Sequence, residues 1–231
     1  MHNLTERLIR EKLAKHSAVL GFDPVQVGQQ SEEWFQMRLG TMTASKAKCI
    51  VAGATTDTRL TYMAELIAEV ATGTHKEMVK AKALDWGNQQ EPHAVASYEF
   101  LNSTQVDSVP LLYSDDMRCA CSPDGVVSDR GLEIKCPLTT EVHIRSITDK
   151  KIKSDYLWQI QYSMFVSGLD LWDFGSFDPR MKKKNLHIIT VERDDKMQKT
   201  LEDAIPQFIS DMDKQLSMLG FDFGDQWICQ E

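Results

Sequence analysis

The segment from Cys121 to Pro137, CSPDGVVSDRGLEIKCP, holds the residue types that phosphodiester hydrolysis requires. Asp124 lies in a turn signal, Ser-Pro-Asp-Gly, while Glu133 and Lys135 lie two residues apart in a short alternating strand. Two carboxylates that meet across a hairpin can share a divalent cation such as Mg²⁺, which prefers oxygen ligands. A neighbouring ammonium can position a water molecule or offset charge that develops on a phosphate.

The strand itself indicates how these groups are presented. Because side chains alternate along a strand, Glu133 and Lys135 are expected on one face and the apolar residues on the other, toward the core. The alternative interpretation is a salt-bridged surface hairpin, which a lone Glu-x-Lys pair would favour. The preceding Pro123-Asp124 favours a catalytic site over such a surface hairpin.

Length and composition predict one domain over residues 1–231. The chain has 231 residues with 42% hydrophobic content, enough for one core. It has no apolar run long enough to cross a bilayer, and its first sixteen residues are charged throughout, unlike a secretory signal. The five cysteines form an odd set without a regular framework, which favours a reducing compartment. We therefore expect a cytoplasmic protein without a membrane partner.

A net charge of −8 does not favour DNA binding if charge is treated as uniform. An acidic exterior can nevertheless coexist with a local basic groove, since only local phosphate contacts set the electrostatic attraction. Three basic segments are candidates, although each could equally be a solvated face: Lys76–Lys82, Lys150–Lys153 and Arg180–Lys184.

Upstream, a second group of residues could hold a phosphate. Ser31-Glu32-Glu33 is typical of a capped helix start, and Gly40 ends that helix just after Arg38. Thr43 is a natural N-cap for a following helix, whose free amides near Ser45 could bind an anion. A guanidinium close to such a helix start would clamp a terminal phosphate, whereas the alternative is a surface arginine beside an ordinary cap.

The remaining periodicities predict helices and strands around these residues. Spacing typical of helices occurs over 4–16, 59–72, 83–101, 154–167 and 196–219, the last interrupted or restarted near Pro206. Alternating or apolar runs predict strands over 106–113, 118–122, 126–127, 131–136, 171–177 and 186–191. On the helix over 154–167, Gln159 and Gln161 diverge by about 160°, so only one can face the site.

The Pro-Asp and Glu-x-Lys pair resembles the motif of the PD-(D/E)XK nuclease superfamily. From about Ser31 to Trp227 the chain further resembles the phage lambda exonuclease family and its viral recombinase relatives, whereas residues 1–30 match it weakly. The blocks that carry this resemblance are Arg38-Leu39-Gly40, Thr43-Ala44-Ser45, Lys82-Ala83-Leu84, Trp86-Gly87 with Glu91, Cys121–Gly125, Glu133–Pro137, Gln159–Met164, Asp178–Lys182 and Val191–Asp194. The resemblance implies an α/β fold with a central mixed β-sheet flanked by α-helices.

The resemblance also implies catalytic roles. Asp124 would bridge two Mg²⁺ ions, for which Mn²⁺ should substitute, and Glu133 with the main-chain carbonyl of Ile134 would complete the tighter metal site. Lys135 would position or activate the attacking water, and Glu91 would be a further acid at the site.

Substrate-binding roles follow in the same way. Arg38, Ser45, Ser122 and Gln159 would hold the terminal 5′ phosphate, with Thr43 at the adjoining helix start. Leu84 would act as an apolar wedge that separates the last base pairs.

The function implied by the resemblance is Mg²⁺-dependent 5′-to-3′ exonuclease activity on linear double-stranded DNA, leaving 3′ overhangs for recombination. Relatives form a ring-shaped homotrimer, and the resemblance implies a single-strand annealing protein that receives the 3′ overhang. A homotrimer and such a partner are therefore expected, and a phage-encoded enzyme would act in the host cytoplasm. The loop over 52–58 has no basic residue where relatives have some, with Arg59 a potential substitute. Two alternatives stay open: a site- or structure-specific endonuclease, and a catalytically silent DNA-end-binding protein.

Overall fold

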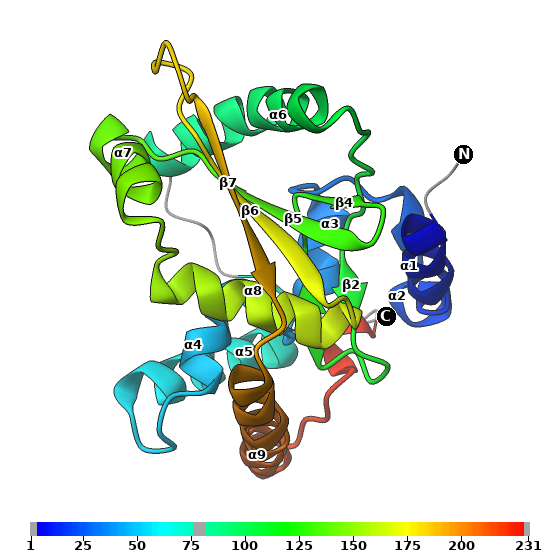
Figure 1. The fold of residues 1–231 in the computed structure, drawn as a ribbon. Helices are drawn as coiled ribbons and strands as arrows, with labels where there is room; N and C mark the ends of the chain where they lie inside the picture. The colour runs from blue at the N-terminus through cyan, green and yellow to red at the C-terminus, as the bar shows by residue number, and fades with distance from the viewer. Residues whose placement is uncertain (1–3, 76–81, 229–231) are drawn as a thin grey trace.

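The computed structural model describes residues 4–75 and 82–228 (Figure 1). The predicted basic segment Lys76–Lys82 therefore falls almost entirely outside the described residues. The helices are α1 (Leu4–Ala14), α2 (Ser17–Leu20), η1 (Pro24–Gln26), α3 (Glu32–Arg38), η2 (Ala44–Lys46), α4 (Ala47–Ile50), α5 (Asp57–Thr72), α6 (Lys82–Asn102), α7 (Thr140–Asp149), α8 (Ser154–Ser167), α9 (Asp195–Leu219) and η3 (Asp225–Trp227). The strands are β1 (Met42–Thr43), β2 (Leu112–Tyr113), β3 (Cys119–Cys121), β4 (Gly125–Val127), β5 (Arg130–Lys135), β6 (Leu171–Phe177) and β7 (Leu186–Glu192).

The strands form two sheets of mixed direction. One has the order β4-β5-β6-β7, in which β5 and β6 are parallel and the outer pairs are antiparallel. The other has the order β1-β3-β2, with β1 parallel and β2 antiparallel to β3. The chain crosses from one sheet to the other at Ser122-Pro123-Asp124, so the predicted meander is divided at the predicted active turn.

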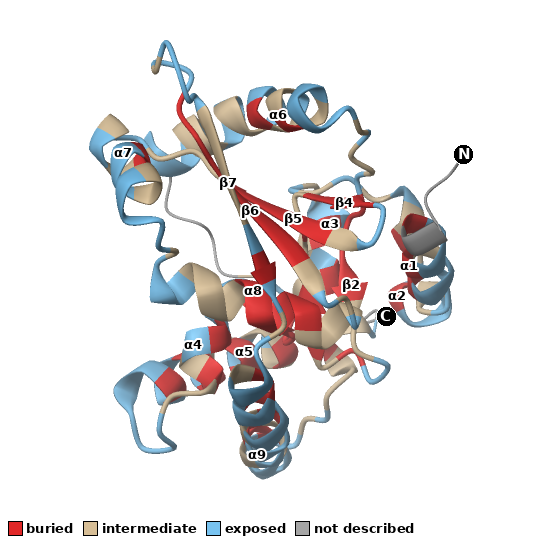
Figure 2. Ribbon diagram, in the orientation of Figure 1, coloured by how far each residue is buried: buried red, intermediate tan, exposed pale blue. Residues whose placement is uncertain are grey.

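Helices cover both faces of the four-stranded sheet, which confirms the predicted α/β class (Figure 1). Ala94 and Tyr98 of α6 pack with Leu132 and Ile134 on one face. On the other face, residues of α8 pack against β6 and β7, namely Ile160 and Met164 with Trp172, Phe174 and Val191. The central strands β5 and β6 are therefore largely buried between α6 and α8, whereas most of the edge strand β7 is only partly buried (Figure 2).

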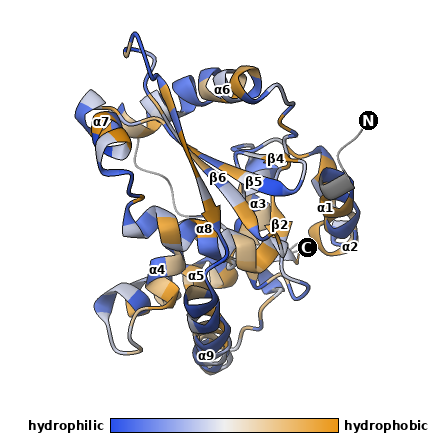
Figure 3. Ribbon diagram, in the orientation of Figure 1, coloured by the Kyte–Doolittle hydropathy of each residue, from blue (hydrophilic) through white to orange (hydrophobic). Residues whose placement is uncertain are grey.

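Helix α9 is amphipathic. Its buried residues recur at helical spacing, and they are Leu201, Ile205, Phe208, Met212 and Leu216. Its outward side is hydrophilic (Figure 3). The predicted interruption at Pro206 is wrong, because this exposed proline lies inside a helix that its buried neighbours hold to the core on both sides.

The predicted strand over 106–113 is also largely wrong, since only Leu112–Tyr113 is a strand. Asp107 forms an isolated bridge with Val126. After it, side chains replace a strand ladder as partners of the backbone: Arg10, Gln29 and Trp34 donate to the carbonyls of Ser108, Val109 and Pro110. Apolar sequence predicted a strand, but these distant donors cannot be inferred from it.

Within the described part of the chain, no helix has both the length and the apolar character that a membrane span requires.

Candidate active site

The break between the two sheets positions Asp124. Its backbone N–H donates to the carbonyl of Leu132 at 3.0 Å, and its Oδ2 accepts from the N–H of Ile134 at 2.5 Å. Because β4 pairs with β5 only as far as Leu132, the Asp124 carboxylate takes the place of the missing partner strand. The N–H and C=O of one strand residue lie on the same edge, so the carbonyl of Ile134 is directed to the side where Asp124 lies.

Glu133 points to the opposite face of β5 from its neighbours, as the alternation predicted. Its side chain is only 3% exposed. Lys135 donates to Glu133 Oε1, and Gln159 of α8 donates to the same oxygen at 2.7 Å. Leu132 and Ile134 are buried on the α6 side. A carboxylate is thus held in the core next to a single ammonium, an arrangement that a surface hairpin would not need.

The other charged groups of the site are crowded. Burial, reinforced by the charge of Glu133, raises the pKa of Asp124 well above its usual range. The same causes raise the pKa of Glu91, which lines one cavity with Asp124 and Lys135. Burial alone would lower the pKa of Lys135, but the Glu133 and Asp124 carboxylates outweigh it and raise that pKa. Lys135 therefore stays an ammonium near neutral pH, 5.3 Å from the ring of Tyr156.

The residues present fit a divalent cation. Asp124, Glu133 and the Ile134 carbonyl offer hard oxygen donors, the class that Mg²⁺ and Mn²⁺ bind. Burial and the charge of Glu133 raise the pKa values of Asp124 and Glu91 despite the nearby Lys135, and a metal ion would add positive charge at these carboxylates. Among residues 4–75 and 82–228, no three His, Cys, Asp or Glu side chains converge as a ready-made metal cluster, so the main-chain carbonyl and water would have to complete the shell.

Arg38 and Ser122 meet as predicted. The Arg38 guanidinium lies 3.4 Å from Ser122 Oγ and stacks over the Trp34 ring at 4.0 Å. Ser31 caps α3 by accepting from the N–H of Trp34 at 3.2 Å, and Gly40, with φ 65°, turns the chain after Arg38. Burial lowers the pKa of Arg38. Among the described residues no carboxylate pairs with this guanidinium, so it is available to an anion.

Thr43 and Ser45 are close in sequence to this clamp, at the start of η2. Thr43 occupies the predicted N-cap position, ahead of η2, although its side chain makes no capping hydrogen bond. Its backbone N–H donates instead to the Tyr62 hydroxyl at 2.9 Å, which buries the residue beside β3. Ser45 is exposed in a three-residue turn that precedes a four-residue helix, α4.

Gln159 and Leu84 reach the site from two helices. Gln159 faces Glu133, whereas Gln161 is buried on the far side of α8 and donates to the Glu192 carbonyl at 2.8 Å, which confirms that only one glutamine faces the site. Leu84, in the first turn of α6, is 40% exposed and lines the cavity with Glu91. Arg59 is 3% exposed and pairs with Asp211 at 2.8 Å, so the suggestion that it substitutes for the loop's missing basic residue is wrong.

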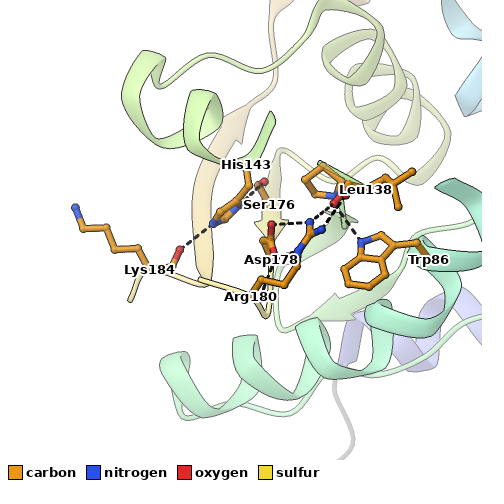
Figure 4. A network of polar contacts seen from close by, with 8 residues as sticks. Trp86, Leu138, His143, Ser176, Asp178, Arg180 and Lys184 are labelled. Carbon is orange, nitrogen blue, oxygen red and sulfur yellow. Dashed lines mark hydrogen bonds and ion pairs between the residues drawn. The ribbon is translucent and has the colours of Figure 1, made fainter. Parts of the chain in front are cut away.

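A polar network fixes the chain just beyond Lys135 (Figure 4). Arg180 donates to both carboxylate oxygens of Asp178 and to the carbonyls of Pro137 and Leu138. The Trp86 ring lies 4.7 Å from this guanidinium, and its Nε1 donates to the Pro137 carbonyl at 3.1 Å. The network therefore ties α6, which carries Glu91 and Leu84, to the end of β5.

A second part of the network anchors α7. The His143 ring is fully buried, with Nε2 donating to the Lys184 carbonyl and Nδ1 next to Ser176 Oγ, both at 2.8 Å (Figure 4). Because both ring nitrogens are used, His143 serves as a structural residue rather than an acid or base at the site.

The sequence indicated most of these residues but not their supports. Trp34 lies four residues before Arg38, a spacing that places side chains on one helix face and could have suggested the stack. Tyr156 was predicted only as part of an apolar helix face. The Arg180 contacts join segments about forty residues apart or more, and no local pattern signals them.

Known proteins share the family and the fold of this chain. Residues 33–170 match the model of the YqaJ-like viral recombinase domain. The structure is similar to LHK-Exo, an alkaline exonuclease from Laribacter hongkongensis, whose structure in complex with dAMP gives a TM-score of 0.75 at 34% identity over 82% of this chain and 96% of that chain.

Two further matches are shorter or more distant. The uncharacterized protein ExoD of Escherichia coli K12 is 46% identical over 76 residues, which are 33% of this chain and 87% of that protein. A phage-related exonuclease from Haemophilus somnus 129PT, at 14% identity over 78% of this chain and 96% of that chain, shares the fold with a TM-score of 0.59. The chain belongs to the YqaJ-like viral recombinase family, has the PD-(D/E)XK nuclease fold and is a nuclease.

Proposed function

We propose that the protein is a Mg²⁺-dependent exonuclease that degrades one strand of linear duplex DNA from its 5′-phosphorylated end and leaves 3′ overhangs. The observation that carries the proposal is the pairing of two groups of residues. One is the acidic centre of Asp124 and Glu133 beside Lys135, and the other is the Arg38–Ser122 clamp.

The acidic centre accounts for the hydrolysis. Asp124, Glu133 and the Ile134 carbonyl would hold up to two Mg²⁺ ions, which supply charge stabilisation and a more acidic water. Lys135, kept charged by its carboxylate neighbours, would orient the attacking water and offset negative charge on the phosphate. Glu91, in the same cavity, would accept a proton or a hydrogen bond from a water molecule.

The clamp accounts for the choice of a strand end. A guanidinium and a hydroxyl form charge-assisted hydrogen bonds to a terminal phosphate, which carries more negative charge than an internal phosphodiester. Ser45, Thr43 and Gln159 are the residues from which further support for that phosphate is expected. The dAMP bound to the relative LHK-Exo is a deoxynucleoside monophosphate, which is the class of product that such an enzyme would release.

Leu84 accounts for access to duplex DNA. An apolar side chain inserted between base pairs costs a few kcal/mol of unstacking per step and separates the strands. Its position on the first turn of α6, 40% exposed at the cavity, is suited to this role.

The proposal includes a ring-shaped homotrimer in the host cytoplasm that passes its 3′ overhang to a single-strand annealing protein. A ring reconciles DNA binding with the net charge of −8, because basic side chains can line a channel while the exterior stays acidic. Analytical ultracentrifugation tests this part: three times the chain mass is expected, and a monomer at working concentration would contradict it.

The nuclease assignment itself is tested on linear and covalently closed circular duplexes of one sequence, in Mg²⁺ and in EDTA. We expect the linear duplex to be degraded only with Mg²⁺ and the circle to stay intact. Cleavage of the circle would instead support a site- or structure-specific endonuclease, and binding of ends without hydrolysis would support a silent end-binding protein.

A further inference from the structure

A cavity of about 630 Å³ extends from the acidic centre between α6, α7 and α8. Asp124, Glu91 and Lys135 lie at its inner end. Leu84 lines it from the first turn of α6, and Tyr156 lines it from α8. Its volume lies within the range of about 300–1,000 Å³ typical of pockets for small molecules. Arg38 and Ser122 do not line it, so the phosphate clamp lies outside this cavity.

The wall formed by α7 and the segment that follows it is basic. Arg145, Lys151 and Lys153 line the cavity, together with one acidic residue of the same region, Asp149. All three cations are exposed. In the described part of the chain none of them has an ion pair with a carboxylate. These cations are therefore available to an anion that enters the cavity.

The backbone conformation after α7 places this basic wall beside the acidic centre. Lys150, with φ 49°, adopts the left-handed conformation that ends α7, an uncommon one for a residue other than glycine. The chain then passes along the cavity to Lys153, which precedes α8. The Lys153 ammonium lies 5.8 Å from the Tyr156 ring, and the catalytic candidate Lys135 lies 5.3 Å from the same ring. The aromatic ring therefore links the basic wall to the acidic centre.

A DNA strand held at both the Arg38–Ser122 clamp and the acidic centre must continue beyond the acidic centre. If its 5′ phosphate lies at Arg38 and its scissile phosphate at Asp124, the rest of the strand must leave the acidic centre on the side away from the clamp. The cavity begins at Asp124, is not lined by the clamp residues and has Leu84 at its wall, so it offers such a path. Phosphates that follow the scissile bond would meet the cations of the cavity wall there.

We propose that this cavity binds the cleaved strand on the 3′ side of the scissile phosphate, holding the nucleotide that is released next. Arg145, Lys151 and Lys153 contact its phosphates, and Tyr156 packs against its sugar or base. This inference rests on the proposed exonuclease function and adds the second-nucleotide subsite to it. Such a subsite would keep the shortened strand in place between successive cleavages.

The test compares two double variants of equal charge change. Lys151→Ala/Lys153→Ala removes two cations from the cavity wall, while Lys196→Ala/Lys199→Ala removes two exposed cations from α9, which does not line the cavity. Steady-state degradation of a 5′-phosphorylated linear duplex is measured for both over a salt series. Since all four lysines are exposed, the melting temperature should stay within about 2 °C of wild type.

We expect the cavity variant to raise KM about tenfold, with kcat within about twofold, and to reduce the slope of log affinity against log salt by about 1.4–1.8 for two lost phosphate contacts. The α9 variant should change KM by less than about twofold and leave the salt slope close to that of the wild type. Equal effects of the two variants would overturn the inference, because a general charge effect would then explain them. A fall in kcat at constant KM would overturn it as well.

A modified substrate separates phosphate contact from indirect effects. A methylphosphonate, which is uncharged, replaces the first phosphate on the 3′ side of the scissile bond. The wild type should lose affinity for this substrate, whereas the cavity variant, which already lacks the partners of that phosphate, should lose much less. Equal losses would contradict the contact. A cavity variant with a normal KM for the duplex but weaker inhibition by free deoxynucleoside monophosphate would also contradict it. That result would show that the cavity binds the released product instead of the next nucleotide.

Failure of the inference can be told from failure of the proposed function. If wild-type protein does not degrade the linear duplex in Mg²⁺, the exonuclease proposal fails. If wild-type protein is active and the two double variants behave alike, only the subsite fails.

Discussion

Replacement of Lys135 by methionine isolates the charge that we place in catalysis. Methionine keeps an unbranched stem of similar length against Tyr156 but has no ammonium. One positioned catalytic group typically contributes about 10²–10⁴ in rate, so turnover should fall by about two to four orders of magnitude, equivalent to about 2.7–5.4 kcal/mol of barrier. Binding of a duplex end, measured by fluorescence anisotropy, should change little because Arg38 and the cavity cations remain.

The same variant should have a smaller effect on stability. Loss of the Lys135 ammonium leaves Glu133, whose side chain is 3% exposed, with Gln159 as the remaining side-chain donor. Breaking a fully buried ion pair costs about 3–5 kcal/mol, but the Lys135 side chain is 30% exposed, so we expect about 1–3 kcal/mol by urea unfolding without metal.

Single-turnover kinetics at saturating DNA and Mg²⁺ provide the assay. Lys199→Met is the control, because it removes an ammonium from an exposed pair with Asp203 far from the site, and both its rate and its stability should stay near wild type. A Lys135→Met enzyme with near-normal single-turnover rates would refute the assigned role. A rate loss fully explained by unfolding at the assay temperature would refute it too.

Three further predictions address the metal, the clamp and the supporting network. Asp124→Asn should raise the Mg²⁺ concentration for half-maximal activity by at least about tenfold, and an unchanged metal titration would contradict the ligand assignment. Arg38→Ala should impair degradation of 5′-phosphorylated ends more than of 5′-hydroxyl ends, whereas equal losses would count against the clamp. Arg180 outweighs burial and lowers the pKa of Asp178 from 3.8 to about 2, so this carboxylate stabilises the fold above about pH 4 and the contribution is lost as pH falls toward 2. Asp178→Asn should therefore destabilise the protein by about 1–3 kcal/mol at neutral pH and show less acid sensitivity in this range by thermal unfolding; a variant as stable as wild type at pH 7 would refute the network's role.

The pattern around β5 shows what sequence can predict. Alternation alone was enough to separate Glu133 and Lys135 from Leu132 and Ile134, because the two faces of a strand obey a strict period of two. The helix over Ser154–Ser167 was predicted with its correct bounds because its apolar period is strong. In both cases the deciding information lies within a few residues.

Predictions failed where distant partners decide the local structure. The apolar run before Leu112 is a loop because Arg10, Gln29 and Trp34 satisfy its carbonyls. Pro206 stays within a helix because buried neighbours hold it there. The cavity wall formed by Lys151 and Lys153 was visible only as a basic segment, since its position beside Asp124 depends on how α7 and α8 pack on the sheet.

Digestion of a linear duplex labelled separately at each 5′ end and each 3′ end, with and without Mg²⁺, tests the central claim most directly. We predict that each 5′ label is released first as a mononucleotide, and only when Mg²⁺ is present, while the 3′ labels stay on long single strands. Release of the 3′ labels first, or intact duplex ends in Mg²⁺, would contradict the assignment of Asp124, Glu133 and Lys135 to 5′-to-3′ hydrolysis.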